Sequence, residues 1–258
     1  MIANRFIIKS ETAKIEPLCC LHVANVAFDE ELFLETVRRI KQNKNRYTII
    51  LGDLHDSIYP NNNEHRYDPD VIDYRFWPPD LGYEWLRKKL KRISNKIIGI
   101  HTGNHDDKLR ILSANHNFVK EDVCKPLKVK YLNGEAFTKL ILLTKDKQYS
   151  YIINSAHGSG NSTTLSGAFH KLEKLPSGIY ADIYLRGHTH QIGSARKVAY
   201  YWKYNHLIKK RIILVSVGSF FDSFKLNKTS YAERKDYLPT DMGTVTIILS
   251  KGEAGVHV

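Results

Sequence analysis

Two stretches, Gly103-Asn104-His105-Asp106 and Gly187-His188-Thr189-His190, decide what this 258-residue chain folds into. Each places side chains that can bind a metal ion directly after a glycine. In two shorter motifs, Gly52-Asp53 and His157-Gly158, the ligand comes directly after or directly before a glycine. Glycine permits a sharp turn and a close approach of the backbone to a bound ion. The four motifs therefore predict metal ligands at the ends of secondary-structure elements.

Short apolar runs rich in Ile, Val, Leu and Tyr predict β-strands. They lie at residues 6–9, 18–23, 47–51, 97–102, 140–143, 151–155, 183–186, 212–217 and 244–249. Apolar residues at helical spacing predict helices at residues 30–42, 83–92 and 167–174. Asp29 is the expected N-cap of the first helix. Strands that alternate with helices, followed by further strands, indicate an α/β layered sandwich.

The length fits one large α/β domain. The sequence contains no internal repeat and no clear linker, so we expect a single domain over residues 1–258. One long irregular stretch, rich in Asn and Pro, covers residues 57–80. We expect it to be an insertion, and loops of this length are usually functional or disordered.

Asp53, Asn104 and His188 each follow a predicted strand through a single glycine. Ligands of open α/β sheets collect outside the carboxyl ends of strands. We therefore expect these three side chains, although far apart in the sequence, to converge at one rim.

The residue types in the motifs favour divalent metals. Imidazole suits zinc and iron, and carboxylate suits manganese as well, so Mn, Zn and Fe are the candidate ions. Two ions about 3.5–4 Å apart promote phosphoryl transfer by polarising the phosphoryl oxygen and supplying a nucleophile at neutral pH. His105 is then free to protonate the leaving oxygen or to stabilise charge, with Asp106 to orient it.

The four motifs, in this order, resemble the calcineurin-like metallophosphoesterase family. The resemblance spans residues 18–190, about two thirds of the chain. It implies an α/β four-layer sandwich of two mixed β-sheets flanked by helices, with two divalent metal ions. It also implies that Asp53 bridges the two ions and that His105 is catalytic. The remaining implied ligands are Cys20, His22 and His190 for one ion, and Asn104, His157 and His188 for the other.

The chain departs from the family at the first motif, where Cys20 stands in place of an Asp two residues before His22. Three interpretations are open. Cys20 binds the metal as a thiolate, which would favour zinc or iron over manganese or magnesium. Alternatively, Cys20 is merely buried and His22, Asp53 and His190 hold that ion weakly. In the third interpretation the site is degenerate, and catalysis is weak or absent.

Further candidates lie outside the ligand motifs. Asn104 and His105 are expected to contact substrate, and His65 and Arg66 in the insertion could reach a substrate phosphate. Asp56, close to the bridging Asp53, has either a supporting role beside the ligands or an ordinary role in a loop.

The formal net charge of +12 suggests a polyanionic partner, with nucleic acid first, although a Lys-rich solvated surface explains it equally well. Two stretches are strongly basic. Residues 87–92 also fit the solvent face of an amphipathic helix. Residues 196–211 interleave cations with aromatics, as surfaces that stack single strands do. The alternative for this second stretch is a β-ribbon whose aromatics pack on the core.

No apolar run is long enough to span a bilayer, and the N-terminus is too short and too charged for a signal peptide. The three cysteines form neither a disulfide framework nor a Cys-x-x-Cys pair. We therefore expect a cytoplasmic protein without a membrane partner.

Together these features predict a metal-dependent phosphodiesterase, with DNA or RNA as candidate substrates and a nuclease as one form of it. Residues 217–221 and 231–234, with Pro239 and Gly243, are similar to the tails of phage and bacterial metallophosphoesterases, some of them DNA-repair exonuclease-like. One alternative is a phosphomonoesterase acting on a phosphoprotein or a small metabolite. Another is a non-catalytic interaction protein on the same scaffold.

Overall fold

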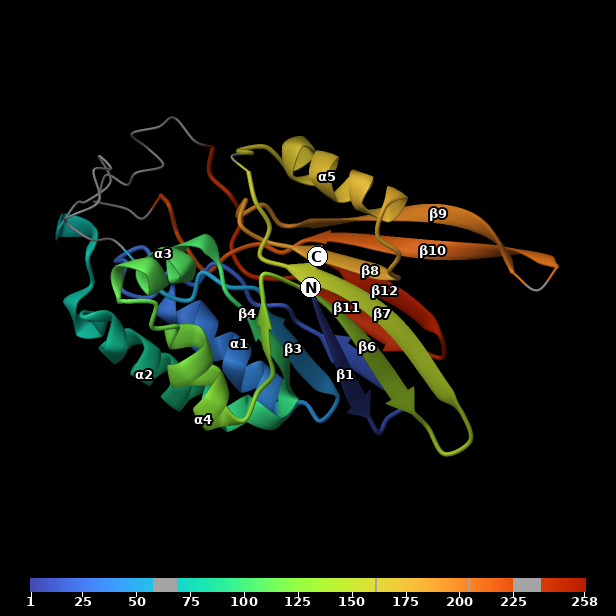
Figure 1. The fold of residues 1–258 in the computed structure, drawn as a ribbon, viewed down its shortest axis with the longest axis horizontal. Coiled ribbons are helices and arrows are strands. Elements are labelled where there is room, and N and C mark those ends of the chain that lie inside the picture. The colour runs from blue at the N-terminus through green and yellow to red at the C-terminus, as the bar shows by residue number, and fades with distance from the viewer. Residues whose placement is uncertain (58–68, 161, 204, 225–237) are drawn as a thin grey trace.

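The computed structural model describes residues 1–57, 69–160, 162–203, 205–224 and 238–258. In this part of the chain the strands form two six-stranded mixed sheets (Figure 1). The first sheet has the order β1-β6-β7-β8-β10-β9 and the second the order β12-β11-β2-β3-β4-β5.

The strands of the first sheet are β1 (Ile2–Ile8), β6 (Glu135–Leu143), β7 (Gln148–Ala156), β8 (Ile183–Arg186), β9 (Gly193–Lys203) and β10 (His206–Ser216). Those of the second sheet are β2 (Thr12–Ile15), β3 (Arg46–Ile50), β4 (Ile97–His101), β5 (Tyr131–Asn133), β11 (Thr246–Ser250) and β12 (Glu253–His257).

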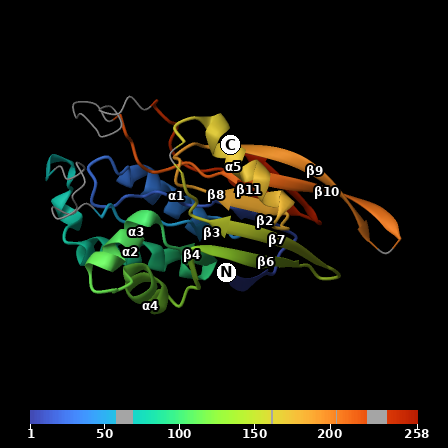
Figure 2. The ribbon, with the colours of Figure 1, turned by 45° about the horizontal axis from the view of Figure 1, so that its top comes forward.

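Helices cover the outer face of each sheet (Figures 1 and 2). On the second sheet lie α1 (Glu30–Gln42), α2 (Pro79–Leu90), α3 (Asn104–Leu112) and α4 (Lys125–Leu127), and on the first sheet lies α5 (Leu165–Lys174). Shorter helical segments are η1 (Pro69–Val71), η2 (Tyr74–Phe76), η3 (Lys91–Lys96), η4 (Val119–Cys124) and η5 (Leu175–Ser177).

Three apolar cores hold these layers together. Between the two sheets, side chains such as Leu140 and Ile153 of the first pack in one cluster with Ile49 and Ile247 of the second. Two further clusters lie between each sheet and its own helices. The result is a four-layer sandwich of two mixed sheets flanked by helices, which confirms the predicted α/β architecture.

The prediction for α1 is confirmed to the residue, since the Asp29 carboxylate accepts a hydrogen bond from Leu32 N at 2.9 Å. The predicted strand at residues 18–23 is wrong. This segment runs beside residues 49–55 through isolated bridges at Leu18 and Val23, and left-handed backbone at Cys20 and His22 interrupts any regular ladder. The expected irregular stretch at residues 57–80 contains η1 and η2, and α2 begins at Pro79.

No helix in the described residues has both the length and the apolar character needed to cross a membrane.

Candidate metal centre

The four glycine motifs meet at one end of the sandwich, two from each sheet. Gly52-Asp53 follows β3 and Gly103-Asn104 follows β4 in the second sheet, whereas His157 follows β7 and His188 follows β8 in the first. Their glycines are needed for packing. A Cβ at Gly52, where φ is +96°, would overlap the backbone of Gly103, and a Cβ at Gly103 would overlap the Asp53 carboxylate.

One cluster of donor atoms forms around His157. Its Nδ1 donates to the Leu51 carbonyl at 2.8 Å, so in the neutral ring the free lone pair is on Nε2. That Nε2 faces three groups: Asp53 Oδ2 at 3.0 Å, Asn104 Oδ1 at 3.1 Å and His188 Nδ1 at 3.2 Å. The oxygens of Asp53 and Asn104 are acceptors, so they need a cation or a proton between them and the imidazole.

The pKa shifts of His157 and Asp53 also indicate that this cluster favours a positive charge. Burial alone would lower the pKa of His157, but the negative charges of Asp53 and Cys19 raise it well above its usual value. Burial alone would raise the pKa of Asp53, and the neighbouring histidines His157, His105 and His22 hold it well below its usual range. A divalent cation fits this set of donors, because carboxylate, amide oxygen and imidazole are all ligands of zinc, iron or manganese.

A second cluster brings Cys20, His22 and His190 together, with one potential ligand atom from each within 4.8 Å of the others. His22 Nε2 lies 3.3 Å from His190 Nε2 and 3.9 Å from Asp53 Oδ2. His22 Nδ1 donates to Asp56 Oδ1 at 3.3 Å, which again leaves the Nε2 lone pair pointing into the cluster. Asp53 therefore lies between the two clusters, in the position that the resemblance implies for a bridge.

Five of the predicted ligands share an unusual backbone conformation. Their φ values are positive: Cys20 52°, His22 50°, Asp53 51°, His188 69° and His190 58°. Non-glycine residues rarely adopt this left-handed conformation, and such residues concentrate at functional sites. Cys20 has the same backbone geometry as its neighbouring ligands, although its side chain differs from the expected carboxylate.

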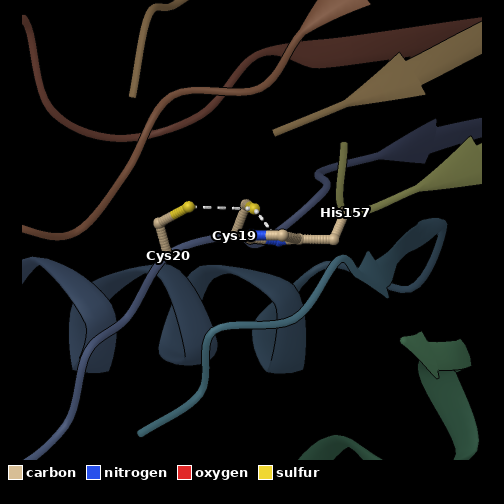
Figure 3. A group of neighbouring side chains, drawn as sticks. All are labelled: Cys19, Cys20 and His157. Carbon is tan, nitrogen blue, oxygen red and sulfur yellow. Dashed lines mark hydrogen bonds between the residues drawn. The ribbon is translucent and has the colours of Figure 1, made fainter. Parts of the chain in front are cut away.

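The two adjacent thiols connect the clusters (Figure 3). Cys19 Sγ lies 3.3 Å from Cys20 Sγ and 3.6 Å from His157 Nδ1, and the figure shows the three side chains in a row. Burial raises the pKa of Cys20, and the nearby Cys19 and Asp53 raise it further. Burial also acts to raise the pKa of Cys19, but Cys20 and His157 outweigh it and lower that pKa to about 6.

His105 stands at the edge of both clusters. Its backbone N–H donates to Asp53 Oδ1 at 2.9 Å, and its side chain is 24% exposed. Its Nδ1 lies 2.9 Å from Asp56 Oδ1. Burial alone would lower the pKa of His105, but the charges of Asp53 and Asp56 raise it to about 9. Both carboxylates therefore favour the protonated form of this ring.

Asp56 holds both His22 and His105. Its carboxylate accepts from His22 Nδ1, contacts His105 Nδ1 and is held in turn by the Asn25 amide. Burial alone would raise the pKa of Asp56, and the bonds to the two histidines lower it strongly. The sequence is compatible with either a supporting role for Asp56 beside the ligands or an ordinary role in a loop. These contacts favour the supporting role.

Asp106 has different partners from those expected of it. Its carboxylate accepts from Gly103 N at 2.9 Å, Leu54 N at 3.2 Å and the Tyr83 hydroxyl at 2.6 Å. These bonds tie the start of α3 to the loop after β3. The carboxylate that pairs with Nδ1 of the His105 ring is that of Asp56 rather than that of Asp106.

Phe221 adds an apolar wall that the motifs did not indicate. Its ring centroid lies 4.9 Å from that of His22 and 5.6 Å from that of His190. No spacing rule pointed to it, because it comes from a segment with no ligand motif. Two other predicted contacts, His65 and Arg66, lie outside the described residues.

Comparisons with known proteins give distant similarities of fold. No protein-family model and no curated protein matches the chain. Among solved structures, 51 chains match. A predicted phosphoesterase from Streptococcus pneumoniae is 12% identical, with a TM-score of 0.37 over 96% of this chain and 88% of that one. GAP50 of the Plasmodium inner membrane complex is 10% identical, with a TM-score of 0.47 over 96% and 84%. Vps29 of Chaetomium thermophilum is 13% identical, with a TM-score of 0.37 over 95% of each chain.

Proposed function

We propose that this chain is a metal-dependent phosphoesterase that hydrolyses phosphodiester bonds with the help of two divalent ions. One observation carries the proposal: two clusters of donor atoms converge on one buried carboxylate, that of Asp53, whose Oδ2 faces both. One ion would be held by Cys20, His22, Asp53 and His190, and the other by Asp53, Asn104, His157 and His188. When bound, such a pair supplies Lewis acidity and a nucleophile at neutral pH.

The remaining polar groups serve proton transfer and orientation. His105 is partly exposed, paired with Asp56 and fixed beside Asp53, so it is placed to give a proton to the leaving oxygen. Asp56 maintains that proton and holds the His22 ring in the tautomer that presents Nε2 to the cluster. The preference for a diester over a monoester is supported by the net charge of +12, which favours a polymeric anion.

Hydrolysis of model esters tests this proposal. Metal-free protein should be supplied with manganese, zinc or no ion and assayed on bis-p-nitrophenyl phosphate and p-nitrophenyl phosphate. We expect metal-dependent turnover with preference for the diester. Preference for the monoester would assign a phosphomonoesterase. Absence of turnover with every ion would leave the non-catalytic interaction protein as the better interpretation.

Replacing Asp56 with asparagine should lower kcat for the diester by about 10–100-fold, the usual cost of losing a group that orients a ligand. The amide keeps the size of the side chain but removes one of the two carboxylate charges that raise the pKa of His105. The pKa of His105, followed by NMR titration, should fall together with kcat. Asp73→Asn, which removes a carboxylate paired with the exposed Arg75, is the control. An unchanged His105 pKa would contradict the role given to Asp56.

The metal preference follows from Cys20, for which we propose the thiolate interpretation. Its left-handed backbone directs Sγ to within 4.8 Å of the His22 and His190 nitrogens, and a bound cation would offset the burial that keeps the thiol protonated. Cobalt(II)-loaded protein should show a thiolate-to-metal charge-transfer band in the near ultraviolet. Cys20→Ser should abolish the band and Cys19→Ser, the matched control, should retain it. The opposite pattern would make Cys19 the ligand, and no band in the parent protein would leave Cys20 merely buried.

A further inference from the structure

The β9–β10 hairpin has one face with no partner in the described part of the protein. The strands pair in antiparallel register, with Trp202 opposite Leu207, Tyr200 opposite Lys209 and Val198 opposite Arg211. Residues opposite each other, or two apart on one strand, share a face of the ribbon. These six residues, Val198, Tyr200, Trp202, Leu207, Lys209 and Arg211, are called here the aromatic-cationic face.

The aromatic-cationic face is open to solvent. Tyr200 is 59% exposed, Trp202 70% and Leu207 62%. Lys209 and Arg211 are also exposed, and no ion pair or hydrogen bond of the described residues engages their side chains. The alternative that the aromatics of this stretch pack on the core is therefore wrong for Tyr200 and Trp202.

The opposite face of the hairpin is already occupied. The Tyr201 ring packs against Tyr180 with centroids 6.2 Å apart, and Lys210 pairs with Asp182. Lys197 Nζ donates to the Glu173 carbonyl at 3.1 Å at the end of α5. These contacts hold the ribbon against its own sheet layer and leave the aromatic-cationic face free for an external partner.

Charge indicates what kind of partner fits. Residues 183–221 contain no Asp or Glu, whereas the hairpin strands carry six Lys or Arg. A second copy of the same face would bring these cations against each other, which disfavours self-association. Exposed aromatic rings between cations match single-stranded nucleic acid, because bases stack on the rings while phosphates meet the cations. Paired bases in a duplex cannot stack on side chains in this way.

The hairpin also extends well beyond the other strands, away from the end that carries the metal clusters (Figures 1 and 2). β9 begins at Gly193, three residues after His190. At about 3.3 Å per residue, Trp202 lies about 30 Å farther along the strand. A small ester cannot contact both places, but a polynucleotide chain can.

We infer that the aromatic-cationic face of the β9–β10 hairpin binds single-stranded nucleic acid and so selects a polymeric substrate. As a substrate preference this rests on the proposed phosphodiesterase function, but the binding itself does not. The face supplies affinity without sequence selectivity, because stacking accepts every base and the cations contact only the backbone.

Binding is tested on the full chain in the presence of a chelator, so that hydrolysis does not interfere. A fluorescein-labelled oligothymidylate should bind with an affinity that falls steeply as salt rises. Tyr200→Thr with Trp202→Thr keeps residues that favour strands and should weaken binding at least about 10-fold. Lys209→Ser with Arg211→Ser should reduce the slope of log affinity against log salt. Lys120→Ser with Lys125→Ser, which removes two exposed cations paired with Glu121, is the control and should bind as the parent does.

Three results would overturn the inference. One is equal affinity of the Tyr200/Trp202 variant and the parent, provided that circular dichroism shows both to be folded. Another is tighter binding of a duplex than of the single strand. The third is a concentration-dependent dimer that the same variant abolishes, because the face would then bind a second copy.

The hydrolysis and binding experiments together distinguish failure of this inference from failure of the proposed function. If the chain hydrolyses a small diester but the hairpin variant binds the oligonucleotide normally, the metal centre stands and the hairpin proposal falls. If oligonucleotide binding depends on the hairpin but no ester is hydrolysed with any ion, the hairpin proposal stands and the proposed phosphoesterase function falls. Where both stand, the ratio of KM for an oligonucleotide to KM for the small diester should rise about 10-fold in the variant.

Discussion

Replacing Asp53 with asparagine is expected to remove at least one of two bound ions and to lower kcat for the diester by about 10³-fold or more. This exceeds the about 10–100-fold expected for a residue that only supports a ligand. Asp53 Oδ2 lies 3.0 Å from His157 Nε2 and 3.9 Å from His22 Nε2, so one carboxylate serves both clusters. An amide halves the available oxygens and introduces N–H donors where a cation is needed.

The measurement is metal content per chain by elemental analysis, together with kcat at saturating diester. Asp107→Asn is the matched control, because Asp107 is a nearby exposed carboxylate paired with Arg110 on α3. It should retain both ions and full turnover. Two ions per chain and normal kcat in Asp53→Asn would exclude a bridging role.

Replacing His105 with glutamine should lower kcat by about 10²–10⁴-fold while metal content stays the same. The imidazole supplies a proton, and glutamine cannot replace it. Proton donation matters most for a poor leaving group, so the loss should be larger for an alkyl ester than for a p-nitrophenyl ester. His116→Gln, at an exposed histidine paired with Asp122, controls for loss of a histidine elsewhere.

The leaving-group comparison separates two roles for His105. His22, Asp53 and His105 also form a group whose potential ligand atoms lie within 4.8 Å of one another. If His105→Gln loses an ion, and the loss of kcat is the same for both leaving groups, His105 is a ligand rather than a proton donor.

Much of the candidate site could be predicted from the sequence because its candidate ligands lie in short motifs with glycine at strand ends. Such motifs indicate which side chains directly follow a strand. Neighbouring parallel strands bring their carboxyl ends, and therefore these side chains, together. The structure indeed gathers Asp53, Asn104, His157, His188 and His190 in one place. The motifs do not predict how each histidine ring is oriented, because the orientation depends on partners distant in the sequence.

Asp56 and Asp106 illustrate this limit. Asp106 is adjacent to His105 in the sequence, which made it the natural candidate to orient that ring. At the start of a helix, however, successive side chains point in different directions, and Asp106 points back to the backbone of Gly103. Asp56, which lies 49 positions away in the sequence, contacts the ring instead.

The segment at residues 18–23 failed as a strand for a related reason. Apolar composition predicts burial, and the segment is buried, but it does not predict φ. Cys20 and His22 are in left-handed backbone, which strands exclude. The strand β9 was expected only through the β-ribbon alternative for residues 196–211, because its many cations and its solvent-exposed face hide the apolar pattern that usually marks a strand.

The origin of the ligands also bears on how the protein matures during synthesis. Each predicted ion takes ligands from both sheets, and the second sheet is completed by β11 and β12 near the end of the chain. Pairings of such high sequence separation form late and slowly in folding. A growing chain that stops before residue 183 contains Asp53, Asn104 and His157 but neither His188 nor His190. We therefore expect high metal affinity to arise only when the two halves of the sandwich have docked, so that metal capture marks completed folding.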